Sequence, residues 1–304
     1  MAEPLLVFVA ATVIAAVLTP FVRALAVGLG AMDPPGERKV HAQATPRLGG
    51  IAICAAGAVA LAGGAPPGVP LVAGVLIVFA TGIVDDLRGV PAIGKLIAVA
   101  AAAVVVAASG VAIRHFTLFG HTYELGTLGW PVTLAWIVGV TNAFNLIDGL
   151  DGLATGLAII AAATCGGLLL VRGDAADARI LIALAGAGVG FLPYNFNPAT
   201  IFLGDCGSLV FGFVLAVTAI TGWQKGATAL AVGAPILVLA LPIADSVGSI
   251  ARRLAGRRPI LAADQRHIHH WLLRRGLSHR AAVLVLYALA LGLAAVALLT
   301  ADLG

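Results

Sequence analysis

The sequence has few charged residues and few cysteines. Asp, Glu, Lys and Arg make up 11% of its 304 residues, and three residues are cysteines. Because about a quarter of the residues in a soluble domain are charged, the composition excludes an ordinary soluble globular domain. Cys54, Cys165 and Cys206 do not have the spacing of a metal site, and two of them lie within apolar runs, so we interpret them as small packing residues.

Long apolar runs dominate the rest of the chain. Hydrophobic residues make up 61% of it and the mean hydropathy is +1.06, which is typical of an integral membrane protein. The runs have helical length, are rich in Gly and Ala and do not alternate with polar residues, which favours packed transmembrane helices over a β-barrel. The first run has no basic residue before its apolar core, so it predicts a first span and not a cleaved signal peptide.

This pattern predicts one domain over residues 1–304, an all-α bundle of about ten transmembrane helices with cytoplasmic catalytic loops. We expect residues 113–128 to form a small hairpin with its turn at Gly120. The expected spans cover residues 4–27, 48–64, 69–84, 92–112, 130–146, 153–171, 178–194, 207–223, 226–250 and 280–301.

The charges are distributed unevenly between the two sides of this bundle. With the N-terminus outside, fourteen of the 18 Lys and Arg residues fall in or beside inner loops. The positive-inside rule then predicts a multi-pass protein of the cytoplasmic (inner) membrane with both termini outside, and it explains the pI of 9.3 without a nucleic-acid partner. Nine acidic residues also fall on the inner side. Acids contribute little to orientation, so they predict a functional site at the cytoplasmic face.

The most informative stretch is NAFNLIDGLDGLATG, residues 142–156. Asn142, Asn145, Asp148 and Asp151 follow one another at three-residue steps, so we expect their side chains to point into one cavity. Oxygen ligands of this kind suit a hard cation such as Mg²⁺, which often accompanies phosphates. The alternative is a polar helix end that contacts water.

Two earlier inner segments carry complementary chemistry. The loop DPPGERKVHAQATPRLGG offers Lys39 and Arg47, among other donors, to phosphate oxygens, although positive-inside flanking is the alternative. Asp85 and Asp86 end one span and Lys95 opens the next. Adjacent acids beside a cation can bind a metal or take a proton from an acidic nucleophile; the alternative is a solvated acidic cap.

Two later segments complete the inner face. In YNFNPATIFLGDCGS, Asn195 begins a loop and Asp205 precedes a helix start that can receive an anion, or Asp205 simply caps that helix. In the longest inner loop, Arg266 precedes His267, His269 and His270. Three histidines can bind zinc, but the neighbouring arginines favour phosphate binding or proton transfer. Asp245 is a further acid, within the preceding span.

Taken together, the segments DPPGERKVHAQATPRLGG, VDDLRGVPAIGKL, NAFNLIDGLDGLATG, NPATIFLGDCGS and DQRHIHHWLLRRG resemble those of the polyprenyl-phosphate N-acetylhexosamine-1-phosphate transferase family, over residues 20–280. The resemblance implies transfer of a sugar 1-phosphate from a UDP-HexNAc to a polyprenyl phosphate, usually undecaprenyl phosphate, with release of UMP. It implies a requirement for Mg²⁺ or Mn²⁺, and it is compatible with a homodimer.

The resemblance also implies roles for individual residues. Asn145 and Asp205 match the metal-contacting pair. Asp85 and Asp86 match the acids near the lipid phosphate, one of them a proposed base, and His267 is placed with them as catalytic. The expected substrate-binding residues are Lys39, Arg47, Lys95, Asp148, Asp151, Asn195, Arg266, His269 and His270.

Three other functions compete with this one. The branch that uses UDP-N-acetylmuramoyl-pentapeptide typically has three consecutive histidines, whereas Ile268 interrupts them here, which favours a UDP-GlcNAc-type donor. A cation-coupled transporter also has membrane acids, but it requires them near mid-membrane. A phosphatidyl transferase of the lipid-alcohol type is expected to have an arginine after its Asp-Gly pair, which this chain lacks.

Overall fold

The computed structural model describes residues 2–34, 44–118, 121–224, 235–257, 259 and 267–301, and these are mainly helical. The described helices are α1 (Ala2–Gly28), α2 (Gly49–Leu61), α3 (Val69–Arg88), α4 (Ala92–Ala108), α5 (Gly129–Ile147), α6 (Leu153–Val171), α7 (Ala175–Asn195), α8 (Asp205–Gln224), α10 (Ala240–Ala255), α11 (Ile268–Arg274) and α12 (His279–Ala301). The strands are β1 (Met32–Asp33), β2 (Thr45–Pro46), β3 (His115–Leu118) and β4 (His121–Glu124), and a 3₁₀ turn covers Gly126–Leu128.

The fold is that of a helical membrane protein. Among the described helices, α1, α3, α5, α6, α7, α8 and α12 are long and apolar enough to cross a membrane, and α2 and α4 are shorter apolar helices. Large apolar side chains face outward, such as Leu6 (67% exposed) and Phe21 (69% exposed) of α1. In water such a surface would be unfavourable, whereas it suits the hydrocarbon of a bilayer.

Most of the expected spans coincide with helices. Nine of the ten ranges each overlap one described helix within a few residues. The range 226–250 begins among residues 225–234, which lie outside the described residues, and ends within α10. That helix continues to Ala255, and Arg252 and Arg253 lie in its last turn, where positive charge suits the helix dipole.

The expected hairpin is confirmed. Strands β3 and β4 pair antiparallel, with His115 opposite Glu124 and Leu118 opposite His121. The expected turn at Gly120 lies outside the described residues. Phe116 and Tyr123 stack across the pair with ring centroids 5.2 Å apart, a contact that favours this register.

Helix α8 lies at the centre of the bundle. It contacts α2, α3, α5, α6 and α7, and its side chains are almost all buried, including Phe211 and Phe213. Its first turn approaches α2 and α3 closely, because Gly50 packs against Gly207 and Gly82 packs against Cys206. A Cβ atom at either glycine would overlap the backbone of α8. The glycines therefore bring the start of α8 against the neighbouring helices.

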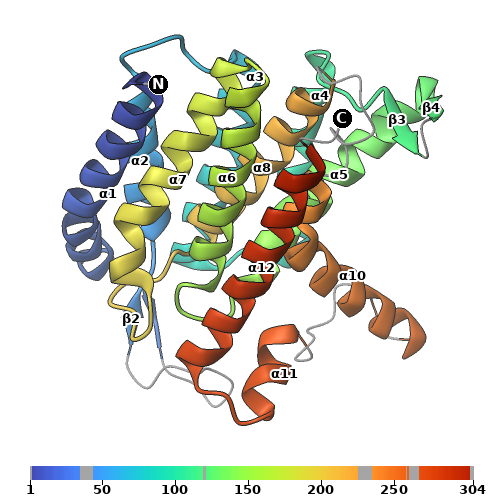
Figure 1. Cartoon of the computed structure of the whole chain (residues 1–304). Coiled ribbons are helices and arrows are strands. Elements are labelled where there is room, and N and C mark those ends of the chain that lie inside the picture. Colours follow the sequence, from blue (N-terminus) through green and yellow to red (C-terminus); the bar gives the residue numbers. More distant parts are fainter. Residues whose placement is uncertain are drawn as a thin grey trace.

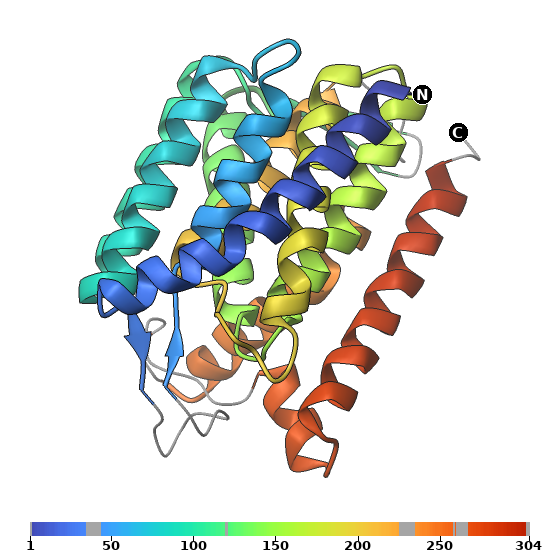
Figure 2. The same cartoon turned by 90° about the vertical axis from the view of Figure 1, so that its left-hand side faces the viewer.

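The two ends of the bundle differ. Helix α1 begins and α12 ends at one end, which we call the terminal end, and the β3–β4 hairpin lies there as well (Figure 1). The β1–β2 pair and α11 lie at the opposite end, which we call the α11 end (Figure 1 and Figure 2). Helix α10 points away from the bundle toward this end (Figure 1).

Candidate active site

A cavity with a volume of about 320 Å³ lies at the α11 end, and its lining is rich in carboxylates. The lining residues are Asp33, Arg47, Asp86, Asp148, Gly149, Leu150, Asp151, Asn195, Phe202, Leu203, Gly204, Asp205, His270 and His279. The residues among them that the sequence singled out as site residues are Arg47, Asp86, Asp148, Asp151, Asn195, Asp205 and His270. Segments far apart in the chain thus supply one site.

The second of the two adjacent acids of α3 holds the start of α8. Asp86 is buried, and its carboxylate accepts hydrogen bonds from the backbone N–H groups of Asp205 (2.9 Å) and Cys206 (3.1 Å). These N–H groups lie in the first turn of α8, where they have no partner within their own helix. A carboxylate at a helix N-terminus is also favoured by the helix dipole. Asp86 therefore fixes the backbone that carries Asp205.

The first acid of the pair has other partners. Asp85 accepts a hydrogen bond from the backbone N–H of Val90 at 2.6 Å, and its carboxylate lies 3.3 Å from the Lys95 ammonium. That ammonium lies 2.6 Å from a carboxylate oxygen of Asp205. Lys95 thus links α3, α4 and α8. One cation thus contacts two carboxylates, and the Asp205 side chain of this group faces the cavity.

Asp148, directly after α5, lies close to the other acids of the cavity. Burial raises the pKa of its carboxyl group well above the ordinary range, and the negative charges of Asp205, Asp86 and Asp151 raise it further. The Arg47 guanidinium opposes this shift, but it also forms an ion pair with Asp33. A bound cation would relieve the repulsion between these carboxylates.

Asp151 anchors the loop that connects α7 and α8. One of its carboxylate oxygens accepts hydrogen bonds from the side-chain amide of Asn197 (2.9 Å) and the backbone N–H of Ala199 (3.0 Å). Its other oxygen lies 4.0 Å from Nε2 of His279. Arg280 of α12 donates to the backbone carbonyl of Asn197 at 2.8 Å. The loop is thereby held by α12 and by the segment before α6.

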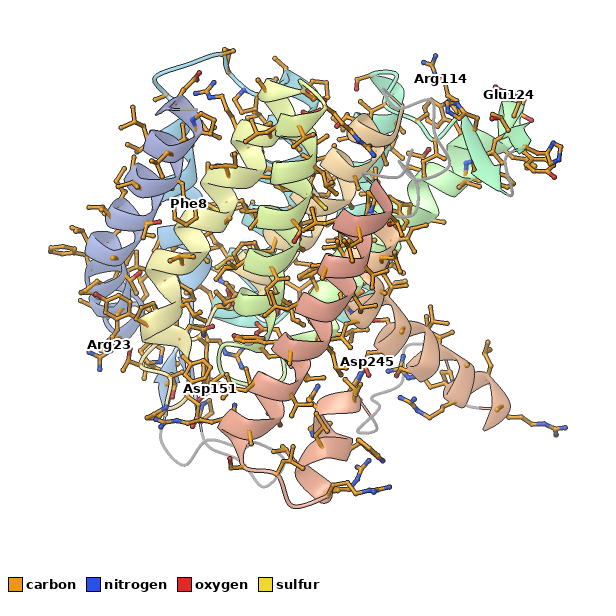
Figure 3. The ribbon with its side chains drawn as sticks, in the orientation of Figure 1. Phe8, Arg23, Arg114, Glu124, Asp151 and Asp245 are labelled. Atoms are coloured by element: carbon orange, nitrogen blue, oxygen red, sulfur yellow. The ribbon has the colours of Figure 1, made fainter. Side chains whose placement is uncertain are left out.

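Two more side chains hold this loop. Asn195 is buried, accepts a hydrogen bond from the Thr155 hydroxyl (2.7 Å) and donates one to the backbone carbonyl of Ile201 (3.2 Å). Arg23, at the α11 end of α1, donates to the carbonyl of Thr200 at 3.1 Å (Figure 3). The side-chain amide of Asn195 therefore holds the loop between α7 and α8, and the residue also lines the cavity.

The histidines form a stacked group around α11. His267 and His269 have parallel rings with centroids 5.6 Å apart, and the centroids of His269 and His270 are 4.3 Å apart. His269 packs against Gly149, where an added Cβ would overlap its ring. Burial, with the nearby His270 and His267, lowers the pKa of His269 to about 3, so its ring is neutral at physiological pH.

Two predicted asparagines do not line the cavity. Asn142 donates to the carbonyl of Val138 within its own helix (2.8 Å), and Asn145 donates to the Ser208 hydroxyl of α8 (3.1 Å). The expectation that four polar side chains point into one cavity is therefore wrong for these two. The reason is that α5 continues regularly to Ile147, and three-residue steps drift around an α-helix. Lys39 and Arg266 lie outside the described residues.

Seven lining residues were not predicted as site residues, and Asp33, Phe202 and His279 are the charged, aromatic or titratable ones among them. Asp33 reaches the cavity because β1 pairs with β2, which lies directly before Arg47. Phe202 lies three residues before Asp205, and its backbone N–H donates to Pro46. His279 begins α12, far along the chain from its neighbour Asp151. Asp33 and Phe202 both lie within segments that the sequence singled out, whereas His279 carried no such signal.

The site suits a metal shared with a ligand better than a metal held by protein alone. Among the described residues, no three His, Cys, Asp or Glu side chains form a ready-made metal-binding group. Asp205 and Asp148 nevertheless line one cavity, where burial and the neighbouring acids disfavour the ionised form of Asp148 and a bound cation would favour it. Mg²⁺ usually takes one or two carboxylates and completes its shell with water and substrate phosphates. The donor set therefore fits Mg²⁺ together with a phosphate ligand.

The chain is similar to known proteins over most of its length. Residues 69–223 match the model of a family described as glycosyl transferase family 4. A probable undecaprenyl-phosphate N-acetylglucosaminyl 1-phosphate transferase of Bacillus subtilis is 39% identical, over 92% of this chain and 80% of the relative. A decaprenyl-phosphate N-acetylglucosaminephosphotransferase of Mycolicibacterium smegmatis is 39% identical (94% and 79% covered), and an undecaprenyl-phosphate alpha-N-acetylglucosaminyl 1-phosphate transferase of Yersinia pestis is 30% identical (88% and 77% covered).

Proposed function

The chain belongs to glycosyl transferase family 4, and from this we propose that it transfers N-acetylglucosamine 1-phosphate to a polyprenyl phosphate in the membrane. The donor is UDP-N-acetylglucosamine and UMP is released. The acceptor is undecaprenyl phosphate or a polyprenyl phosphate of similar length. The product, a polyprenyl-diphosphate-linked sugar, serves the synthesis of cell-envelope glycans.

The position of the cavity is the observation that supports this function best. Asp148 directly follows the last residue of α5, and Asp205 is the first residue of α8. Both acids thus lie where membrane-length helices end, and a lipid phosphate and a water-soluble nucleotide can meet there. A cation-coupled transporter would instead require its acids near the middle of its helices.

The cations around the cavity would bind the phosphates. Arg47 lines the cavity and Lys95 contacts Asp205. We assign both to phosphate oxygens, together with Lys39 and Arg266 from the adjoining segments. A phosphate nucleophile must approach a diphosphate, so repulsion between the two anions has to be offset by positive charge.

We assign Asn145 and Asp205 to a Mg²⁺ or Mn²⁺ ion. When bound, the ion supplies positive charge that polarises the diphosphate of the donor. Asp86 holds the backbone N–H of Asp205 and Lys95 contacts its carboxylate, while the side-chain amide of Asn145 donates to the Ser208 hydroxyl. These hydrogen bonds restrict the orientation of the two side chains, as the partners of metal ligands generally do.

The remaining lining residues would bind the nucleoside and the sugar. Asp148 and the ring of Phe202 are our candidates for the uridine, since an aromatic face can stack on a base. Asp151 and Asn195 hold the loop beside them. We assign His270, which lines the cavity, and His269 beside it to the sugar phosphate. Because Asp86 already accepts two backbone hydrogen bonds, we assign proton transfer to Asp85 and His267.

We also propose ten membrane crossings in the cytoplasmic membrane, with the α11 end in the cytoplasm. The seven long apolar helices, α2 and α4 account for nine crossings. The segment that ends in α10 would supply the tenth. The start of α1 and the end of α12 both lie at the terminal end (Figure 2), which agrees with an even number of crossings.

Purified protein in detergent, with undecaprenyl phosphate and Mg²⁺, tests this function. Radiolabelled UDP-GlcNAc, UDP-GalNAc and UDP-N-acetylmuramoyl-pentapeptide are offered separately, and lipid-soluble label and UMP are measured. We expect label from UDP-GlcNAc alone. Label from the muramoyl donor alone would replace the proposed donor, and no label from any donor, with active control enzymes, would contradict the transferase.

A further inference from the structure

One carboxylate outside the cavity organises the histidine group. Asp245 of α10 accepts or shares a hydrogen bond with Nδ1 of His267, and the two atoms are 2.7 Å apart. Its other oxygen accepts a hydrogen bond from the backbone N–H of Ile268 at 2.8 Å. The side chains of Asp245 and His267 are only 4% and 7% exposed. The carboxylate lies where α10 approaches α11 (Figure 3).

These two contacts determine where the hydrogen of the His267 ring lies. A carboxylate at ordinary pH has no hydrogen to give, so the short contact requires the hydrogen to be on Nδ1. In the neutral ring, Nε2 then carries the lone pair. The partner of one ring nitrogen therefore sets the chemistry of the other, as in carboxylate–histidine pairs generally.

The same carboxylate sets the position of α11. The N–H of Ile268 belongs to the first residue of this helix, and Asp245 satisfies it from another helix. The next two residues of α11 are His269, which packs on Gly149, and His270, which lines the cavity. The contacts of Asp245 thus extend to the site through α11.

We propose, on the basis of the transferase function above, that Asp245 is a positioning residue that holds His267 in the Nδ1–H form and leaves Nε2 as an acceptor for a substrate hydrogen. Asp245 itself does not touch the substrate. His267 is the group through which it acts. The carboxylate of Asp245 determines which nitrogen of the His267 ring carries the hydrogen, and it also holds the ring in position.

An asparagine at position 245 gives a specific consequence. The N–H of Ile268 is a donor, so it requires the amide oxygen of the new side chain. The amide NH₂ group must then face Nδ1 of His267, and it donates to that nitrogen. The ring hydrogen moves to Nε2, which becomes a donor. The shape of the site is almost unchanged, but the acceptor is lost.

A proline at position 268 removes the contact of Asp245 with the backbone N–H of this position and keeps its contact with Nδ1 of His267. Proline has no N–H and is well accepted at the first position of a helix. The preceding residue must be extended, and His267 has φ −62° and ψ 155°, which meets that requirement. In Ile268→Pro the pairing of Asp245 with His267 remains. In the double variant Asp245→Asn/Ile268→Pro the amide can turn its oxygen toward Nδ1–H, and the original form of the ring returns.

The experiment compares the three variants with the wild type in the transfer assay, with Glu124→Gln in the distant β4 strand as a control. We expect Asp245→Asn to lower kcat by about 100-fold to 10,000-fold with little change in KM, which is the range of a lost acid–base group. We expect Ile268→Pro to keep most of its activity and the double variant to exceed Asp245→Asn. ¹⁵N spectra of labelled histidine, assigned with His267→Gln, report the ring form directly.

Different results would contradict the role of Asp245, the orientation of the amide or the proposed function. Full activity of Asp245→Asn, or an unchanged ring form in its spectra, would overturn the proposal. If Ile268→Pro were active but the double variant were no better than Asp245→Asn, the orientation argument would be wrong. The spectra apply even if the proline variant does not fold. A wild type that transfers no sugar phosphate but shows the Nδ1–H form would contradict the proposed function and leave the pairing intact.

Discussion

Charged residues behave differently at the two ends of the bundle. At the α11 end, Asp86 and Lys95 connect different helices around Asp205, and these side chains are largely buried. At the terminal end, the buried Arg179 pairs with Glu3, which is 68% exposed, and Arg114 and Glu124 belong to an outlying hairpin (Figure 3). At the terminal end, one partner of the ion pair and the hairpin charges are open to solvent, whereas the charged side chains at the α11 end are enclosed and depend on one another.

The strongest test of this contrast is Asp205→Asn. It removes the charge to which Lys95 is paired and which we assign to the metal. We expect transfer to fall about 1,000-fold, because a metal supplies several kcal/mol of stabilisation to the transition state. Thermal unfolding should change little. The transfer assay checks the first point, and full activity would remove Asp205 from the site.

A matched pair of glycines in α2 tests whether close packing at the α11 end matters. Gly50 meets the backbone of α8, whereas nothing lies within 4 Å of a Cβ placed at Gly57. We expect Gly50→Val to lower the free energy of unfolding by about 1 to 3 kcal/mol and to reduce activity, since backbone cannot move aside easily. Gly57→Val should be nearly neutral. Equal melting temperatures of the two variants in detergent would contradict the packing argument.

The buried His269 predicts a dependence of stability on pH. Its pKa in the fold is about 3, below the ordinary 6.5, so the unfolded chain binds a proton that the folded chain does not. The resulting stability is complete above about pH 6.5 and is lost as the pH falls toward 3. The raised pKa of the Asp148 carboxyl group makes a contribution to stability with the opposite dependence on pH.

The prediction is therefore tested by comparing how the stability of the wild type and of His269→Gln changes with pH. Between pH 7.5 and pH 5, the wild type should lose about 2 kcal/mol more stability than His269→Gln, as judged from denaturant unfolding in detergent. A loss of the same size in both proteins would show that His269 does not contribute. Arg179, at the terminal end, causes no comparable change of stability between pH 7.5 and pH 5, because arginine stays charged.

The smallest effect is expected at the terminal end. Glu3→Gln removes a carboxylate that lies 3.0 Å from Arg179 but is mostly exposed. Exposed ion pairs contribute about 1 kcal/mol or less. We expect unchanged transfer and a melting temperature within a degree or two of the wild type. A loss of activity here would mean that the two ends are coupled.

The sequence predicted the helices well because apolar length is a local property. It also predicted that Asp148, Asp151 and Asp205 lie near one another, since each was expected at an inner span end or in an inner loop. It did not separate Asp85 from Asp86, although adjacent residues of an α-helix point about 100° apart and so meet different neighbours. The proximity of His279 to Asp151, and of Asp245 to His267, depends on tertiary packing that no local pattern contains.

The loop between α7 and α8 has a consequence for how the protein is made. Its anchors include Arg280 of α12, and Tyr287 of the same helix donates a hydrogen bond to the carbonyl of Gly152. A ribosome synthesises α12 after every other described helix. The acids of the earlier segments are therefore synthesised before α12 can anchor the loop, and the cavity acquires its final shape only after α12 has been inserted.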